Sequence, residues 1–119
     1  MGLDLFAGIS VRDFQAALRW YERLLGAAPS FFPNDVEAVW ELAENRWLYV
    51  EHRPAHAGHA LITVIVDDLE ERVAGIARRG LTPASDETYE NGVRKVTYRD
   101  PEGNEVGFGG TPNPGEPAS

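Results

Sequence analysis

The chain contains no cysteine, which excludes disulfide bonds, thiolate zinc sites and cysteine nucleophiles. Its longest mainly apolar run, residues 60–66, has the length of a strand and is too short to span a membrane. No charged and apolar leader precedes the first strand pattern, so we expect a cytoplasmic protein. Basic residues are scarce, because 11 lysines and arginines stand against 19 acidic residues, a net charge of −8. This charge disfavours nucleic acid and anionic membranes and favours cationic partners.

The length and composition predict one globular domain. A chain of 119 residues with 43% hydrophobic and 25% charged residues can bury a core without disulfides or metals. We assign this domain to residues 1–112. Residues 111–119 are rich in proline, show no hydrophobic periodicity and are expected to form a flexible tail.

The first half of the chain has the pattern of one strand, one helix and three more extended segments. Residues 5–11 alternate as a strand does, and Asp13 stands where a helix N-cap belongs. From Phe14 the apolar residues recur at steps of three and four, and Gly26 is placed to end this helix. A short extended segment follows at 30–32. Residues 36–43 and 46–52 then form a predicted hairpin across Glu44–Asn45.

The second half repeats the first. Asp68 follows Asp13 by 55 residues, and the same offset places Val66 against Val11 and Leu69 against Phe14. The chain therefore contains two tandem βαβββ units, residues 3–53 and 59–110, joined by a linker at 54–58. We predict an α+β fold in which the helices cover the outer face of a curved mixed or antiparallel sheet. The opposite face curls into a cup.

Three features together resemble the vicinal oxygen chelate superfamily, which includes glyoxalases, bleomycin resistance proteins and extradiol dioxygenases. They are the duplicated βαβββ order, the segment Trp20-Tyr21-Glu22-Arg23-Leu24-Leu25-Gly26, and the turn Asp100-Pro101-Glu102-Gly103-Asn104. The resemblance covers residues 3–110 and implies the fold just described. It does not decide the activity, because this scaffold carries lyases, epimerases, dioxygenases and proteins that only bind.

The resemblance also implies where a metal would be held. Members that depend on a metal bind it with side chains of the first and last strands of each unit, and these positions are Phe6, Tyr49, Leu61 and Gly107 here. Phenylalanine, leucine and glycine offer no donor atom, and a neutral phenol is a poor ligand by itself. We therefore predict that the chain holds no metal and no other cofactor.

A shifted register leaves one alternative metal site. His59 lies two residues before Leu61, and Glu105 lies two residues before Gly107, so each shares a strand face with a family position. This pair is the remaining metal hypothesis. His52, His56 and His59 have no helical or finger-like spacing and are interpreted as part of a polar linker.

The cup is predicted to be lined by aromatic residues. A two-residue turn at Glu44–Asn45 would pair Leu42 with Trp47 and Trp40 with Tyr49, on the same face as Phe6, and would turn Glu41 toward the helices. The second hairpin would bring Arg94, Val96 and Tyr98 beside Glu105. The predicted ligand-binding residues are Phe6, Trp40, Trp47, Tyr49, Leu61, Arg94, Tyr98 and Glu105. The alternative is that these aromatic residues fill the cup or a dimer interface.

These features favour a metal-free protein that binds a small aromatic or cationic molecule, such as an antibiotic, as bleomycin-resistance-type members do. Aromatic walls bind flat molecules by burial and stacking, and the acidic charge attracts cations. A homodimer is expected from the resemblance. The alternative is an enzyme: a metal-dependent lyase or dioxygenase with displaced ligands, or a metal-free isomerase that uses Glu105, Tyr98 or Arg94.

Overall fold

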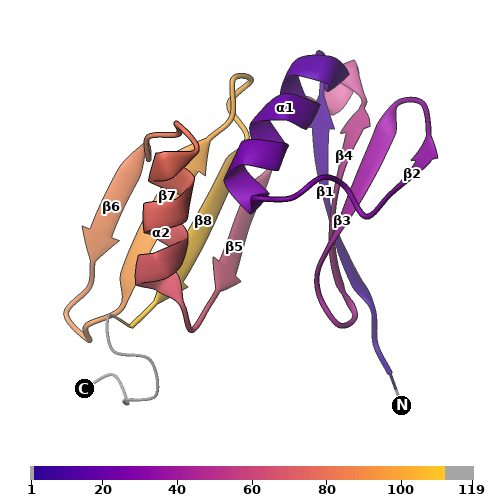
Figure 1. The fold of residues 1–119 in the computed structure, drawn as a ribbon. Coiled ribbons are helices and arrows are strands. Elements are labelled where there is room, and N and C mark those ends of the chain that lie inside the picture. Colours follow the sequence, from indigo (N-terminus) through magenta and orange to yellow (C-terminus); the bar gives the residue numbers. More distant parts are fainter. Residues whose placement is uncertain (1, 112–119) are drawn as a thin grey trace.

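A computed structural model describes residues 2–111 and contains the two predicted βαβββ units (Figure 1). Unit one consists of β1 (Leu5–Val11), α1 (Phe14–Leu25), β2 (Phe31–Asn34), β3 (Glu37–Ala43) and β4 (Arg46–His52). The linker contains a short 3-10 helix, η1 (Pro54–His56). Unit two consists of β5 (Leu61–Ile65), α2 (Leu69–Arg78), β6 (Ser85–Thr88), β7 (Arg94–Arg99) and β8 (Glu105–Gly110). The predicted α+β fold class is confirmed. The predicted tail lies outside the described residues, except for Thr111.

Each unit forms its own four-stranded mixed sheet. The strand orders are β1-β4-β3-β2 and β5-β8-β7-β6, so corresponding strands occupy corresponding places. In both sheets the first strand of the unit pairs in parallel with the last strand, and the remaining pairs are antiparallel. In each unit the helix packs against one face of the sheet, which we call the helix face. We call the opposite face the open face.

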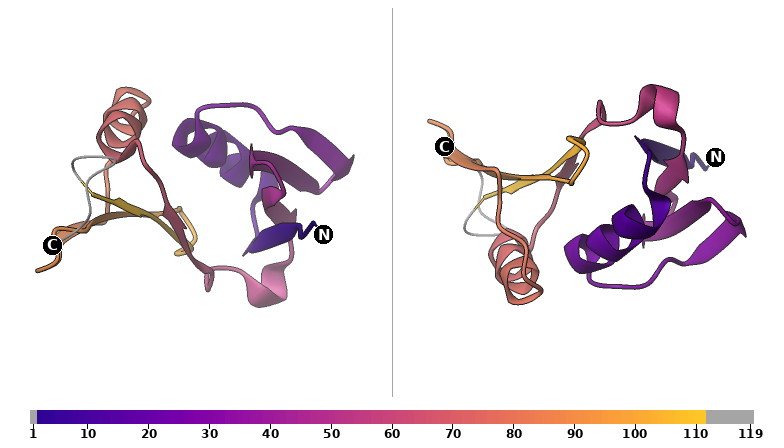
Figure 2. Two further views of the ribbon diagram at one scale, coloured as in Figure 1. Left: turned by 90° about the horizontal axis from the view of Figure 1, so that it is seen from below. Right: turned by 90° about the horizontal axis from the view of Figure 1, so that it is seen from above.

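Helix α1 begins and ends where the sequence predicts. The Asp13 carboxylate accepts a hydrogen bond from the Ala16 backbone N–H at 3.0 Å, and Gly26 ends the helix with φ at 75°. Its apolar side, which includes the fully buried Tyr21, packs on the helix face of the first sheet. In Figures 1 and 2, α1 also lies on the side of that sheet that faces unit two.

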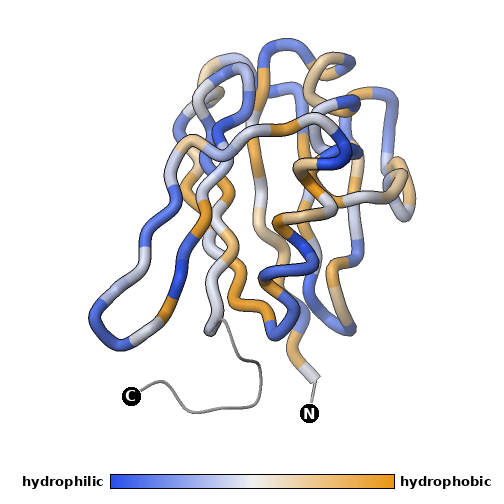
Figure 3. The backbone as a smooth tube through the Cα atoms, turned by 60° about the vertical axis from the view of Figure 1, so that its left-hand side comes forward, coloured by the Kyte–Doolittle hydropathy of each residue, from blue (hydrophilic) through white to orange (hydrophobic). Residues whose placement is uncertain are grey.

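Both units contribute to one core. The largest fully buried side chains come from α1 and α2 and from the helix faces of both sheets, and they are Tyr21, Tyr98, Phe108, Ile9, Leu24, Leu48, Leu69 and Ile76. Figure 3 shows hydrophobic and hydrophilic stretches alternating along the strands, as sheets with one buried face require. None of the helices among residues 2–111 is long and apolar enough to span a membrane.

The Asp100–Asn104 turn of unit two joins the two units through buried polar contacts. The Tyr21 hydroxyl donates to Asp100 Oδ2 at 2.9 Å, and Asn104 Nδ2 donates to the same oxygen at 2.9 Å and to the Ser10 carbonyl at 3.1 Å. The Glu102 carboxylate accepts from the backbone N–H groups of Arg12 and Asp13, just before α1. Burial first, and then the Asp100 charge, raise the pKa of Tyr21 far above its usual value.

Candidate functional site

The open face of the first sheet carries a cluster of aromatic side chains, which we call the aromatic face: Phe6, Phe31, Trp47 and Tyr49. Phe6 of β1 lies directly opposite Trp47 of β4, and their rings stack with centroids 5.4 Å apart and planes 7° apart. Phe31 meets Trp47 edge-on at 6.2 Å. Phe6 is 50% exposed, so the cluster offers ring surface to a binding partner.

The Tyr49 ring crosses the sheet over Gly8. A Cβ at residue 8 would lie 2.5 Å from the phenol carbon and oxygen of Tyr49, closer than van der Waals contact permits. Gly8 is therefore the residue that lets this ring lie flat against β1 and extend the aromatic face. The predicted placement of Phe6, Trp47 and Tyr49 on one sheet face is confirmed by the register of β1 against β4.

Glutamates border the aromatic face. Glu41 of β3 lies opposite Trp47, and Glu37 lies opposite Glu51, on the same side of the sheet. Their only ion pair among the described residues is a long one, at 3.9 Å, between Glu51 and Arg53. Like charges directly opposite each other across strands are unfavourable, so a cation near Glu37 and Glu51 would relieve their repulsion. The aromatic rings and these carboxylates together suit an aromatic cation.

The open face of the second sheet is apolar at its edge strand, and the Lys95 side chain lies over Gly107 at its centre. Leu61 and Ile65 of the edge strand β5 are 79% and 73% exposed. Beside them in β8 stand Gly107 and Gly109, and Glu105 forms an ion pair with Arg99 at 3.4 Å. Such large apolar side chains are unusual on an edge strand that is exposed to water.

The open faces do not supply the ligands that a catalytic metal of this fold needs. The register places Phe6, Tyr49, Leu61 and Gly107 on the two open faces, as the resemblance requires. None of the four is a histidine or a carboxylate. Among residues 2–111, no group of three or more histidines, cysteines, aspartates or glutamates is placed to hold a metal. The donor chemistry of these positions therefore does not fit a metal.

The two residues of the alternative metal pair, His59 and Glu105, make no direct polar contact among the described residues. His59 is exposed and precedes β5. The Glu105 carboxylate is paired with Arg99 instead. His52 and His56 are also exposed, as expected of residues at a polar linker.

The prediction that Trp40 lines the cup is wrong. Trp40 lies opposite Leu48 on the helix face, is only 2% exposed, and donates its indole N–H to the Ala27 carbonyl at 3.0 Å. A register shift in β3 between Glu41 and Ala43 causes this change, because it leaves Leu42 without a partner and reverses the faces of the residues before it. The same bulge places Glu41, not Trp40, on the open face.

The predicted placement of Arg94 and Tyr98 beside Glu105 is also wrong. Arg99 is the partner of Glu105, so Tyr98 lies opposite Val106 on the helix face and packs edge-on against Phe108. The acid–base trio of the isomerase alternative is therefore divided between opposite faces of the sheet. The Tyr98 hydroxyl is the one buried side-chain polar atom without a hydrogen-bond partner in residues 2–111. Burial raises the pKa of this phenol.

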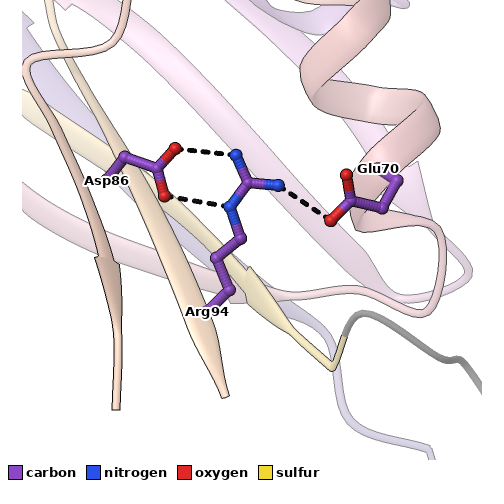
Figure 4. Close-up of polar contacts among 3 residues, drawn as sticks. All are labelled: Glu70, Asp86 and Arg94. Carbon is purple, nitrogen blue, oxygen red and sulfur yellow. Dashed lines mark hydrogen bonds and ion pairs between the residues drawn. The ribbon is translucent and has the colours of Figure 1, made fainter. Parts of the chain in front are cut away.

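Arg94 ties β6, the last strand of the second sheet, to α2, the helix that covers this sheet (Figure 4). Its guanidinium forms two hydrogen bonds with Asp86 of β6, at 2.9 and 2.7 Å, and one with Glu70 of α2 at 2.8 Å. Hydrogen bonding to Arg94 lowers the pKa of Asp86. The two-pronged geometry is one that arginine favours with carboxylates, and here it anchors the first turn of α2 to the sheet. The guanidinium of Arg94 is thus occupied by two structural partners, Asp86 and Glu70.

Comparison with known proteins agrees with this architecture. The family model described as the Glyoxalase/Bleomycin resistance protein/Dioxygenase superfamily matches residues 2–108. The chain belongs to this superfamily. The solved structure of a glyoxalase / bleomycin resistance protein from Catenulispora acidiphila DSM 44928 is 57% identical, with a TM-score of 0.90 over 93% of this chain and 100% of that chain. No protein with a curated description matches.

More distant members of the superfamily share the fold alone. A bleomycin-binding protein solved in complex with bleomycin is 20% identical, with a TM-score of 0.72 over 93% of this chain and 99% of that chain. A lactoylglutathione lyase from Agrobacterium tumefaciens is 17% identical, with a TM-score of 0.72 over 92% of this chain and 94% of that chain. A binding protein and an enzyme are thus about equally similar to this chain, so the choice of function depends on the site itself.

Proposed function

We propose that this protein binds a small aromatic cation on the aromatic face of its first sheet, without a metal and without catalysing a reaction. The stacked pair of the half-exposed Phe6 and the partly buried Trp47 carries this proposal, because flat ring surface of this kind gains energy when a second flat molecule covers it. Glu41, opposite Trp47, supplies the charge that a cation needs. The missing ligands at the family's metal positions support a function that requires no metal.

We propose that a second copy of the chain covers the open face of the second sheet. Leu61 and Ile65 on the second sheet are too exposed for an edge strand that stays in water, and an isologous dimer would bury both edges at once. Binding of an antibiotic is the most specific form of this proposal, supported by the fold shared with the protein that was solved with bleomycin. A cytoplasmic location stays a prediction.

Fluorescence titration with bleomycin as the probe tests the binding proposal. Trp47→Leu should weaken binding by about threefold to tenfold, the value of one aromatic stack. Trp20→Phe is the control, because Trp20 lies on α1 against Tyr21 and away from the aromatic face. Equal affinities of wild type and Trp47→Leu would refute the proposed site. Elemental analysis that found a stoichiometric divalent metal would refute the metal-free function.

Sedimentation velocity tests the dimer separately. Leu61→Glu places a charge on the open face of the second sheet at a side chain that is 79% exposed, so the monomer should fold normally. We expect a dimer for the wild type and a monomer for this variant. A wild-type monomer at high protein concentration would refute the dimer and leave the titration result unaffected.

A further inference from the structure

A groove of about 680 Å³ lies between the two units. Trp40 and Leu25 of unit one form one wall, and Val64, Val66 and Phe108 of unit two form the other. The groove lies at the helix faces, because Trp40 pairs with Leu48 and Phe108 pairs with Val96 there. Its volume lies in the range of pockets that hold small organic molecules.

Two aromatic side chains at the back of this groove are held by packing and by one hydrogen bond. Trp40 and Phe108 are each 2% exposed, and the indole N–H of Trp40 is held by the Ala27 carbonyl, which also lines the groove. These two rings are therefore held in place at the back of the groove, and a ligand would not have to order them. Apolar walls favour a ligand with a compact hydrophobic body.

The charged residues around the groove determine which charge a ligand should carry. Arg72 pairs with Asp68 at 3.2 Å, and its guanidinium lies 5.4 Å from the centre of the Phe108 ring. The groove thus already holds one cation between a carboxylate and an aromatic face. Besides the Arg72–Asp68 pair, the charged residues that line the groove are Asp67, Glu41 and Arg46, and none of these three forms an ion pair in the part of the chain that the structure describes. The remaining charge is negative.

We propose that this inter-unit groove is a second binding site, separate from the aromatic face, for a small organic cation with a hydrophobic body. The body would rest against Trp40, Val64 and Val66, and the cationic group would lie at Asp67. This site is distinct from the aromatic face, because none of Phe6, Phe31, Trp47 and Tyr49 lines the groove, although Glu41 borders both.

The three tryptophans of the chain make the test direct. With ¹⁵N-labelled tryptophan, the indole N–H signals of Trp40, Trp47 and Trp20 report on the groove, the aromatic face and neither site, respectively. The probes are benzyltrimethylammonium, benzyl alcohol and benzoate, which share a ring and differ in charge. We expect the Trp40 signal to shift saturably with the cation, less with the alcohol and least with benzoate.

Two variants and one control variant assign the site. Asp67→Asn should weaken the binding reported by Trp40 by about threefold to tenfold, and Asp35→Asn, an exposed acid outside the groove, should not. Ala43→Phe, at an exposed residue that lines the groove, should abolish the Trp40 response while the Trp47 signal is unchanged.

Four outcomes would overturn the proposal. A shift confined to Trp47 would mean that the cation binds the aromatic face alone. A stronger response to benzoate than to the cation would mean that Arg46 and Arg72 set the charge of the groove. An unchanged affinity in Asp67→Asn would remove the carboxylate from the site. A Trp40 signal that responds only after dilution to monomer would mean that a second copy fills the groove.

Discussion

Replacing Tyr21 with phenylalanine removes one buried hydrogen bond and leaves the packing of the ring unchanged. The Tyr21 hydroxyl donates to Asp100, which is 4% exposed, so no water can take its place. Hydrogen bonds to charged groups contribute about 1.5–3 kcal/mol. Asp100 keeps three other donors, the backbone N–H groups of Glu102 and Asn104 and the Asn104 side chain. We therefore expect a loss of about 2 kcal/mol, within the lower half of that range.

Urea unfolding at fixed protein concentration measures this loss. With the slopes usual for small proteins, about 2 kcal/mol lowers the midpoint by about 1 M. Tyr89→Phe is the matched control, because Tyr89 is 45% exposed and its hydroxyl makes no hydrogen bond to a described side chain. If Tyr21→Phe stays within about 0.5 kcal/mol of the wild type, as Tyr89→Phe should, the buried contact does not join the units as we infer.

Three further predictions concern stability. Burial raises the pKa of Tyr21 and Tyr98 in the folded state, so their contribution to the free energy of unfolding is fully present below the pKa of an unfolded tyrosine, near 10. Above that pH the free energy of unfolding should fall by up to about 1.4 kcal/mol per pH unit for each phenol. Urea midpoints measured from pH 8 to 11 should show this fall, and a flat profile would contradict it. Arg94→Gln should cost about 1 kcal/mol in 0.1 M NaCl and less in 1 M; an equal cost in both would exclude an electrostatic origin. Gly58→Ala should lower the free energy of unfolding in urea by about 1–3 kcal/mol more than Gly80→Ala does. Both glycines have a positive φ, but only at Gly58 would a Cβ meet a backbone atom, the Glu102 carbonyl oxygen at 2.6 Å. Equal losses would mean that the backbone relaxes.

The duplicated architecture could be predicted because its signals are local. Asp13 and Gly26 bound α1 as expected, since capping depends on a few neighbouring residues. The first strand was predicted at residues 5–11, the bounds that β1 has. The two helices also keep the predicted offset, with Asp13 and Asp68 at corresponding N-caps, although Asp68 pairs with Arg72 instead of capping α2.

Strand faces were predicted less well, because one unpaired residue reverses every side chain that precedes it. The bulge at Leu42 moves Trp40 to the core, and Asn45 has a φ of 63°, so the hairpin does not follow the simple two-residue register. The sequence contains one sign of the bulge. The simple two-residue turn would direct Glu41 toward the helix face, where an unpaired glutamate is unfavourable. In β7 the alternation of polar Lys95, Thr97 and Arg99 with apolar Val96 and Tyr98 gives the same information.

The candidate site could be predicted only in part. Phe6, Trp47, Tyr49, Leu61 and Glu105 lie on the open faces as expected, because their strands pair in parallel without bulges. Sequence reasoning did not place Phe31 against Trp47, since that contact depends on how β2 pairs with β3 across an irregular register. The groove between the units depends on how two separate sheets pack, and no local pattern in the chain reports it.

The position of Glu102 has a consequence for how the two halves depend on each other. A side chain from the last hairpin supplies acceptors for the start of the first helix, whereas the corresponding turn of the first half, Glu44–Asn45, gives no such contact in return to α2 among the described residues. The repeats are therefore no longer interchangeable, although they share a strand order. A protein nicked between Arg53 and Gly58 should reassemble from its two fragments, whereas two identical N-terminal fragments should not replace it.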